Sequence, residues 1–188
     1  FEVPLRSMRR RGPDARGIKI TERAILFHTR LIVVDPENGA QPMTQKENGL
    51  EYTIVYNGEL YNTEELRKEL TAAGIEFFGH SDTEVVLKSY IHWGEKCLDR
   101  FNGIFAFAVW EEATQRLFFA RDRMGVKPFF YALKNDTFIF GSEIKTLLEY
   151  PDIEPVIDRK GIVDLLFIGP GRTPGCGVFR DIHELEPG

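Results

Sequence analysis

Cysteines are scarce in this sequence, long apolar runs are absent, and acidic residues outnumber basic ones. Cys97 and Cys176 are the two cysteines among 188 residues, and neither has the paired spacing of a metal site. Two thiols cannot form a disulfide framework, so we expect a reducing, cytoplasmic location. No apolar run approaches the length of a membrane span, and no signal peptide is recognisable. The net charge of −5 argues against a dedicated surface for nucleic acid or an anionic membrane.

The composition is that of an ordinary globular domain, with 43% hydrophobic and 28% charged residues. The sequence begins at Phe1 rather than at Met, and we expect further residues upstream. Residue patterns predict strands at 17–20, 24–34, 52–56, 75–78, 104–110, 116–121, 129–133 and 137–140. They predict helices after Asn62, Ser81, Ser142 and Asp158, and a loop rich in Gly and Pro at 169–177. Strands that come in hairpins, with helices grouped between them, indicate an α+β fold of antiparallel sheets covered by helices.

The stretch 52–62 combines a strand, a turn signal and a helix start. Its first five residues are β-branched or aromatic, and Asn57-Gly58 is predicted to break the strand. Asn62 and Glu65 have the spacing of a capping box that opens a helix. Taken alone, Asn57-Gly58 favours a plain hairpin turn. The alternative is that the Asn amide and the Gly backbone N–H point at one spot, where they could stabilise an oxyanion.

Two charged residues allow a similar pair of interpretations. Arg30 interrupts an apolar segment, where it could pair with a core carboxylate or bind an anionic ligand. Asp82 follows Ser81 in a second capping box with Glu84, where its charge would suit a helix N-terminus whether or not it binds a ligand. Arg121 and Asp122 favour a structural role over a catalytic one.

Seven stretches together resemble one family. The matching stretches are residues 11–14, 28–31, 55–62, 81–85, 102–108, 120–128 and 142–145. In order and spacing the chain resembles the glutaminase domain of class II glutamine amidotransferases, and within that class the glutamine-hydrolysing asparagine synthases. The likeness covers nearly the whole chain, so we expect residues 1–188 to be one such domain.

The resemblance implies an N-terminal-nucleophile hydrolase fold, a four-layer sandwich of two antiparallel sheets between helix layers. It implies that an N-terminal Cys attacks the side-chain amide of glutamine, with its own amino group as the base. It also implies a C-terminal synthetase domain beyond residue 188, which would use ATP and magnesium to amidate aspartate with the ammonia released. No cofactor or metal is expected for the glutaminase domain itself, and a homodimer is possible.

The resemblance also assigns roles to particular residues. Asn57 and Gly58 would be the oxyanion donors, Arg30 would bind the α-carboxylate of glutamine, and Asp82 would bind its α-ammonium group. Glu59 would add a polar group beside the site. The residues expected to line the pocket after Arg30 are Leu31, Ile32, Val33 and Val34.

The sequence departs from the family pattern in two respects. The nucleophilic Cys and the first strand that carries it are missing from the sequence, and Thr29 stands where a second Arg is usual. One explanation is a domain fragment of an ordinary asparagine synthase. The other is a paralogue that kept the fold, lost glutaminase activity, and serves as a binding or scaffold module for a synthetase domain. In both cases we expect the chain as written to be inactive as a glutaminase.

Overall fold

The computed structural model describes residues 2–32, 35–168 and 173–188. The chain forms two compact units. The larger unit consists of residues 9–120, and the smaller unit joins the N-terminal eight residues to residues 121–188.

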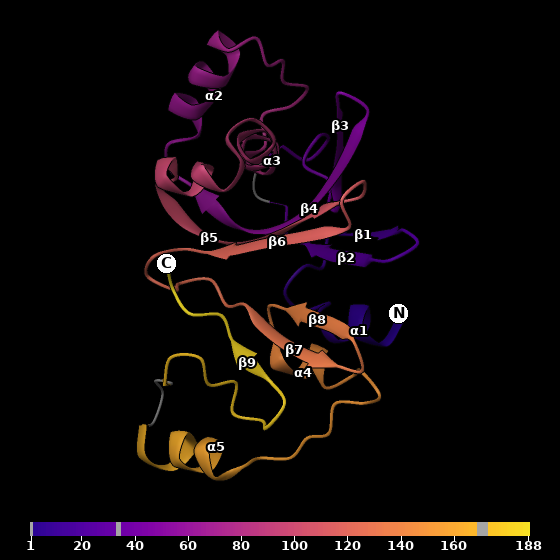
Figure 1. The fold of residues 1–188 in the computed structure, drawn as a ribbon, viewed down its shortest axis with the longest axis vertical. Coiled ribbons are helices and arrows are strands. Elements are labelled where there is room, and N and C mark those ends of the chain that lie inside the picture. The colour runs from indigo at the N-terminus through magenta and orange to yellow at the C-terminus, as the bar shows by residue number, and fades with distance from the viewer. Residues whose placement is uncertain (1, 33–34, 169–172) are drawn as a thin grey trace. The chain divides into compact units, whose positions relative to one another are not determined.

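A four-stranded sheet is the centre of the larger unit (Figure 1). Its strands, in spatial order, are β3 (Met43–Glu47), β4 (Leu50–Leu60), β5 (Gly103–Glu111) and β6 (Arg116–Arg121). Strand β4 is antiparallel to both β3 and β5. The predicted strands at 52–56, 104–110 and 116–121 are confirmed. Their β-branched and aromatic residues pack well on a pleated surface. Strand β3 was not predicted, because its residues are largely polar.

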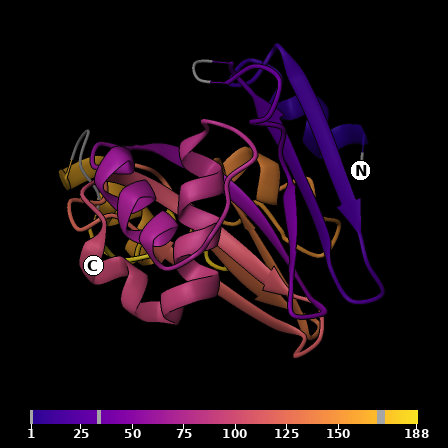
Figure 2. The same ribbon diagram turned by 90° about the horizontal axis from the view of Figure 1, so that it is seen from above.

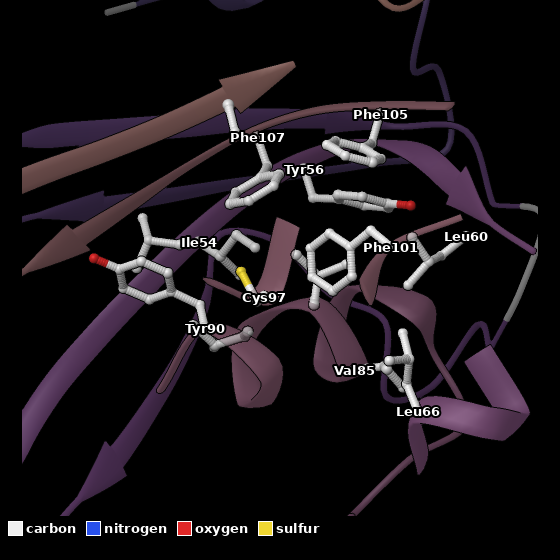
Figure 3. Packing of buried hydrophobic residues seen from close by; sticks show 14 of the residues in the cluster. Ile54, Tyr56, Leu60, Leu66, Val85, Tyr90, Cys97, Phe101, Phe105 and Phe107 are labelled. Atoms are coloured by element: carbon white, nitrogen blue, oxygen red, sulfur yellow. The ribbon is translucent and has the colours of Figure 1, made fainter. Parts of the chain in front are cut away.

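Helices α2 (Thr63–Ala72) and α3 (Asp82–Trp93) cover one face of this sheet (Figure 1). A 3-10 segment, η1 (Gly94–Arg100), follows α3. Buried side chains from the strands and helices form the core between them, as Figure 3 shows for Ile54, Phe107, Leu66 and Val85. Gly74 and Gly94, with φ of 87° and 60°, follow α2 and α3 as the predicted stops.

The Ser81 cap of α3 is confirmed, since its Oγ accepts a hydrogen bond from the Glu84 backbone N–H at 3.3 Å. The reciprocal half of the predicted box is different. The Glu84 carboxylate accepts from the backbone N–H groups of Phe78 and Gly79, each at 2.9 Å. These bonds hold residues 75–78 as an irregular segment, so the strand predicted there is wrong.

The predicted strand break at Asn57-Gly58 is also wrong. Strand β4 continues to Leu60, with Asn57 opposite Ala106 and Gly58 opposite Phe105. Gly58 does not have the positive φ of a turn glycine. A Cβ at this position would lie 2.6 Å from the Ile104 carbonyl oxygen and 2.8 Å from the Phe105 Cα. Glycine is therefore needed for the close approach of two strands, not for a bend.

Asn62 does not cap α2 through its side chain, contrary to the predicted capping box. Its Nδ2 donates to the Arg100 carbonyl at 2.9 Å, and its Oδ1 accepts from the Asn102 backbone N–H at 3.0 Å. The side chain thus ties the end of β4 to the segment before β5. A long-range partner has replaced the local one.

A hairpin of β1 (Ala15–Ile20) and β2 (Ile25–Arg30) completes the larger unit (Figure 2). It confirms strands within the predicted stretches 17–20 and 24–34, although β2 ends at Arg30. Of the residues that follow, Val33 and Val34 lie outside the described residues.

The smaller unit contains a three-stranded sheet in the order β8-β7-β9. Its strands are β7 (Phe130–Lys134), β8 (Thr137–Gly141) and β9 (His183–Glu184). The predicted hairpin between β7 and β8 is confirmed, with its turn at Asn135 and Asp136, whose φ values are 50° and 59°. Antiparallel sheets with helices confirm the α+β class.

The helices of the smaller unit are short: α1 (Glu2–Ser7), α4 (Ile144–Leu147) and α5 (Arg159–Val163), which a π-helical turn, η2 (Asp164–Ile168), extends. Asp158 caps α5 as predicted, accepting from the Gly161 N–H at 2.9 Å. The helix predicted from Ser142 begins later, with Glu143 at its N-cap and no side-chain cap bond. In the predicted loop 169–177, residues 169–172 lie outside the described residues. Among the helices that are described, none is long and apolar enough to cross a membrane.

Candidate functional site

The residues predicted for the site come from three elements of the larger unit. Arg30 is the last residue of β2, Asn57 and Gly58 lie within β4, and Asp82 is the first residue of α3. Because Ser81 caps α3, it fixes where the helix begins and places Asp82 in the first turn. Hydrogen bonds from His28 to Tyr56 and from Tyr56 to Asp82 link these elements.

Asp82 is held by a strand residue and by its own helix. Its Oδ2 accepts from the Tyr56 hydroxyl at 3.0 Å, and its Oδ1 accepts from the Thr83 N–H at 2.9 Å. Burial raises the pKa of Asp82, while the bond from Tyr56 acts in the opposite direction. Burial also raises the pKa of Tyr56, which keeps its hydroxyl protonated as a donor. The result is a partly desolvated carboxylate that a cationic group would stabilise.

Gln41 joins β4 to the first turn of α3. Its Oε1 accepts from the Tyr56 backbone N–H at 2.6 Å, and its Nε2 donates to the Thr83 Oγ at 3.2 Å. Sequence reasoning missed both Gln41 and the role of the Tyr56 hydroxyl. Gln41 lies in a loop with no distinctive pattern, and the Tyr56 bond depends on how α3 packs on the sheet.

Arg30 is buried, with 8% of its surface exposed. Its Nη2 donates to the Asp35 carbonyl at 2.7 Å, and its Nη1 donates to the Pro36 carbonyl at 3.3 Å. A Cβ at Gly39 would lie 2.0 Å from Nη2, so glycine leaves room for the guanidinium. The structure therefore shows Arg30 organising the loop after β2, and its predicted contact with a ligand carboxylate stays a prediction.

The Asp35 side chain continues this link toward Asp82. Its Oδ2 accepts from the His80 backbone N–H at 2.6 Å, and its Oδ1 accepts from the Asn38 N–H at 3.0 Å. These bonds lower the pKa of Asp35, the His80 bond having the largest effect. Because His80 is two residues before Asp82, the loop that binds the Arg30 guanidinium is fixed to the segment that leads into α3.

Asn57 presents an unusual amide. Its Nδ2 is buried, and no acceptor among the described residues forms a hydrogen bond with it. A buried donor without a partner costs about 1–3 kcal/mol, so such groups are rare in stable folds. An amide held at this cost in a strand can serve as a preformed donor, which is what an oxyanion would need.

His28 supports β4 from β2 and is neutral. Its Nε2 lies 3.2 Å from the Tyr56 carbonyl oxygen. Burial is the main cause that lowers the pKa of His28 to about 4, and the Arg30 charge adds to the effect. A neutral ring that bonds a carbonyl through Nε2 must carry its proton there. Its Nδ1 is a buried acceptor for which the described residues supply no donor.

The remaining predicted site residues are Glu59, Leu31, Ile32, Val33 and Val34. Glu59 is exposed on β4, and 58% of the Leu31 surface is exposed. The Ile32 N–H donates to the Asp14 Oδ2 at 2.8 Å. The predicted pocket-lining role of Val33 and Val34 lies outside the described residues. The roles of all these residues stay predictions.

Neither cysteine has the surroundings of a nucleophile. Cys97 is fully buried in the core of the larger unit, where burial raises its pKa to about 12. Cys176 is buried in the smaller unit, and its pKa is also raised by burial. Reactive thiols are partly exposed and have lowered pKa values, so both cysteines are structural.

Two hollows among the described residues are lined by residues other than those predicted for the site. One, of about 670 Å³, lies in the larger unit against residues of α2 and the segment 74–80, and the other, of about 260 Å³, lies in the smaller unit.

Arg121, which lines the smaller hollow, has several partners. It forms an ion pair with Glu184 at 2.9 Å and donates to three backbone carbonyls. Asp122 accepts from three backbone N–H groups of the turn that follows it. The structural role predicted for Arg121 and Asp122 agrees with these contacts.

Comparison with known proteins places the chain in a family. The family model described as Glutamine amidotransferase domain matches residues 2–188. The chain is 54% identical to asparagine synthetase (glutamine-hydrolyzing) 3 of Bacillus subtilis (strain 168) over 181 residues, which cover 96% of this chain and 30% of that protein. It is 41% identical to asparagine synthetase (glutamine-hydrolyzing) 1 of the same organism over 179 residues, or 95% of this chain and 28% of that protein.

A solved structure shows the same fold. It is the glutamine phosphoribosylpyrophosphate amidotransferase from B. subtilis, with a TM-score of 0.65 and 19% identity over 77% of this chain and 39% of that chain. The fold is thus that of the N-terminal-nucleophile hydrolases. The chain spans less than a third of the length of the two synthetases that it matches.

Proposed function

Because this chain belongs to the family of glutamine amidotransferase domains, we propose that it binds glutamine and releases ammonia from the side-chain amide. The Asn57 amide carries the proposal: it is a buried donor without a partner among the described residues, on the strand that also bears Tyr56. The Tyr56 hydroxyl in turn holds the Asp82 carboxylate. An oxyanion donor and a desolvated anion on linked elements suit the amide and ammonium ends of an amino acid.

The roles follow from the chemistry of each group. The Asn57 amide, with the Gly58 N–H, would donate to the oxygen that becomes negative when the glutamine amide is attacked. The Asp82 carboxylate would bind the α-ammonium group, whose charge offsets the cost of burying the anion. Arg30 would bind the α-carboxylate, since a guanidinium can form two parallel bonds to it.

The attacking group in this proposal is a cysteine outside residues 1–188. Cys97 and Cys176 are buried thiols with raised pKa values, which makes them poor nucleophiles. Attack on the amide carbon would form a thioester and release ammonia, and water would then release glutamate. The chain itself would supply binding and oxyanion stabilisation.

The ammonia would be used by a further domain of the same polypeptide. Both synthetases with which the chain was compared have names that state glutamine hydrolysis and asparagine synthesis, and this chain matches less than a third of each. We therefore propose that the longer protein is a cytoplasmic, glutamine-hydrolysing asparagine synthase. The ATP and magnesium that amidation of aspartate requires would bind to that further domain.

The test is to compare glutamine with ammonia as nitrogen source for the full-length protein. Glutamate release and glutamine-dependent asparagine formation are expected. Asp82→Asn should raise the KM for glutamine and leave ammonia-dependent synthesis unchanged, because ammonia bypasses the glutamine site. Ammonia-dependent synthesis without any glutamine hydrolysis would instead indicate a binding or scaffold module.

A further inference from the structure

The segment 162–168 of the smaller unit, hereafter the apolar segment, exposes an unusual amount of hydrophobic surface. It runs from the end of α5 through η2. Leu166 and Phe167 are 71% and 81% exposed. The exposed apolar residues of the segment are Ile162, Val163, Leu165, Leu166, Phe167 and Ile168. Single exposed apolar residues are common, but a contiguous group marks an interaction surface.

The one polar residue of the apolar segment points inward. Asp164 is 3% exposed, and its Oδ2 accepts from the Thr173 N–H at 3.1 Å while its Oδ1 accepts from the Thr173 hydroxyl at 2.5 Å. The Thr173 bonds lower the pKa of Asp164, which keeps the carboxylate charged. The arrangement is the reverse of an ordinary surface helix, whose polar side faces water and whose apolar side faces the core.

The backbone prevents the segment from rotating to bury its apolar side. Gly161 is buried, and a Cβ there would lie 1.9 Å from the Val178 carbonyl oxygen and 2.9 Å from the Ile157 Cγ2. The Asp158 cap, which accepts from the Gly161 N–H, fixes the start of α5. Gly161, Asp158 and Asp164 thus lock the outward direction of the apolar side chains. Burying a side chain such as Leu or Phe gains about 1.5–3 kcal/mol, so this fixed surface is costly in water.

We propose that the apolar segment is the interface of this chain with a further domain of the same polypeptide. The inference rests on the proposed function, in which the chain is one part of a longer protein. Its exposed side chains carry no charge, so the partner surface must also be apolar.

The size of the apolar segment favours a linked domain over a second copy. A stable interface between separate proteins uses about 20–30 residues a side, whereas the apolar segment exposes six apolar side chains. A domain on the same polypeptide is present at a high effective concentration and needs a smaller contact. The relatives are long enough to contain such a domain, because the matched part is only 30% of the more similar synthetase.

Photo-cross-linking of the full-length protein tests the proposal. The photoreactive residue p-benzoylphenylalanine would replace Phe167, with Phe78 as the matched control position, since Phe78 is 78% exposed and belongs to the larger unit. The expected product is a monomer whose cross-link joins position 167 to a peptide outside residues 1–188, at a yield independent of protein concentration. A cross-link between two copies, or a yield no higher than at position 78, would overturn the proposal.

A pair of charge substitutions gives a second readout. Leu166→Asp should make the region outside residues 1–188 more susceptible to limited proteolysis, because the partner domain loses its contact. Leu133→Asp is the control, since Leu133 is 69% exposed in the same unit. Equal susceptibility of the two variants would contradict the proposal. Glutamate release by the wild-type protein is measured in parallel, so that an active glutaminase without the cross-link rejects the interface alone, and an inactive protein with it rejects the proposed function alone.

Discussion

Substitution of Asn57 can distinguish a catalytic role of this residue from a structural one. Since its Nδ2 has no acceptor among the described residues, Asn57→Ala removes an unsatisfied buried donor. We expect the midpoint of thermal unfolding to stay the same or rise. Loss of an oxyanion donor should lower kcat for glutamine hydrolysis in the full-length protein by about 10²–10³.

Glutamate release and thermal melting, measured on the same preparations, check this prediction. Lys68→Ala is the control, because Lys68 is exposed on α2 of the same unit and has no predicted role at the site. A lower melting temperature with normal kcat in Asn57→Ala would show that the residue serves the fold instead.

His28 gives a prediction about pH. Its pKa is lowered from 6.5 to about 4 in the folded state, so the unfolded state binds a proton more readily. Its contribution to stability is therefore complete above pH 6.5 and is lost as the pH falls toward 4. The loss amounts to about 3 kcal/mol, from 1.36 kcal/mol for each pKa unit.

Urea unfolding of residues 1–188 at several pH values measures this loss. In His28→Gln the amide can still donate to the Tyr56 carbonyl but does not titrate. The difference in unfolding free energy between the wild type and the variant should change between pH 7 and pH 4.5 in favour of the variant. A difference that stays constant over this range would mean that His28 is not desolvated.

Strand β4 depends on the absence of a side chain at Gly58. In Gly58→Ala the new Cβ would lie 2.6 Å from the Ile104 oxygen, and backbone atoms of β5 cannot move aside as a flexible side chain can. We expect a loss of unfolding free energy of about 1–3 kcal/mol, the usual range for overpacking. Urea unfolding beside Glu59→Ala, which makes no such contact, measures it, and a loss below about 0.5 kcal/mol would contradict the close-approach explanation.

Strand β4 also shows where local sequence patterns predict the structure correctly and where they do not. The β-branched and aromatic residues at 52–56 predicted a strand, and they form the first half of β4. Asn57-Gly58 and Asn62 carry turn and cap signals that are satisfied instead by distant residues, the backbone of β5 and the segment 100–102. Tertiary partners overrode local propensity where two segments far apart in sequence meet. Caps with no such competitor, at Ser81 and Asp158, were predicted correctly.

For the whole molecule, the fold class could be predicted from the sequence and the assembly of the site only in part. The α+β class follows from strands that come in hairpins with helices grouped between them, which is a local property. The family motifs indicated Arg30, Asn57 and Asp82, but not what holds them. Gln41 and the Tyr56 hydroxyl bridge β4 and α3 through contacts that exist only after packing. The apolar segment likewise has the composition of a buried helix, and its outward orientation is visible only in the folded chain.

Both cysteines should be unreactive in the folded protein. Cys97 is fully buried and Cys176 is 5% exposed, and burial raises the pKa of each thiol. Since the thiolate is the reactive form, a glutamine-analogue electrophile should label neither residue in the folded protein. Intact-mass analysis of residues 1–188 should therefore show no adduct, whereas unfolding in urea should make both thiols reactive to a general thiol reagent. In the full-length protein a single label is expected on a cysteine outside this chain. A label on Cys97 or Cys176 under folded conditions would place the nucleophile within the chain and overturn the division of roles proposed above.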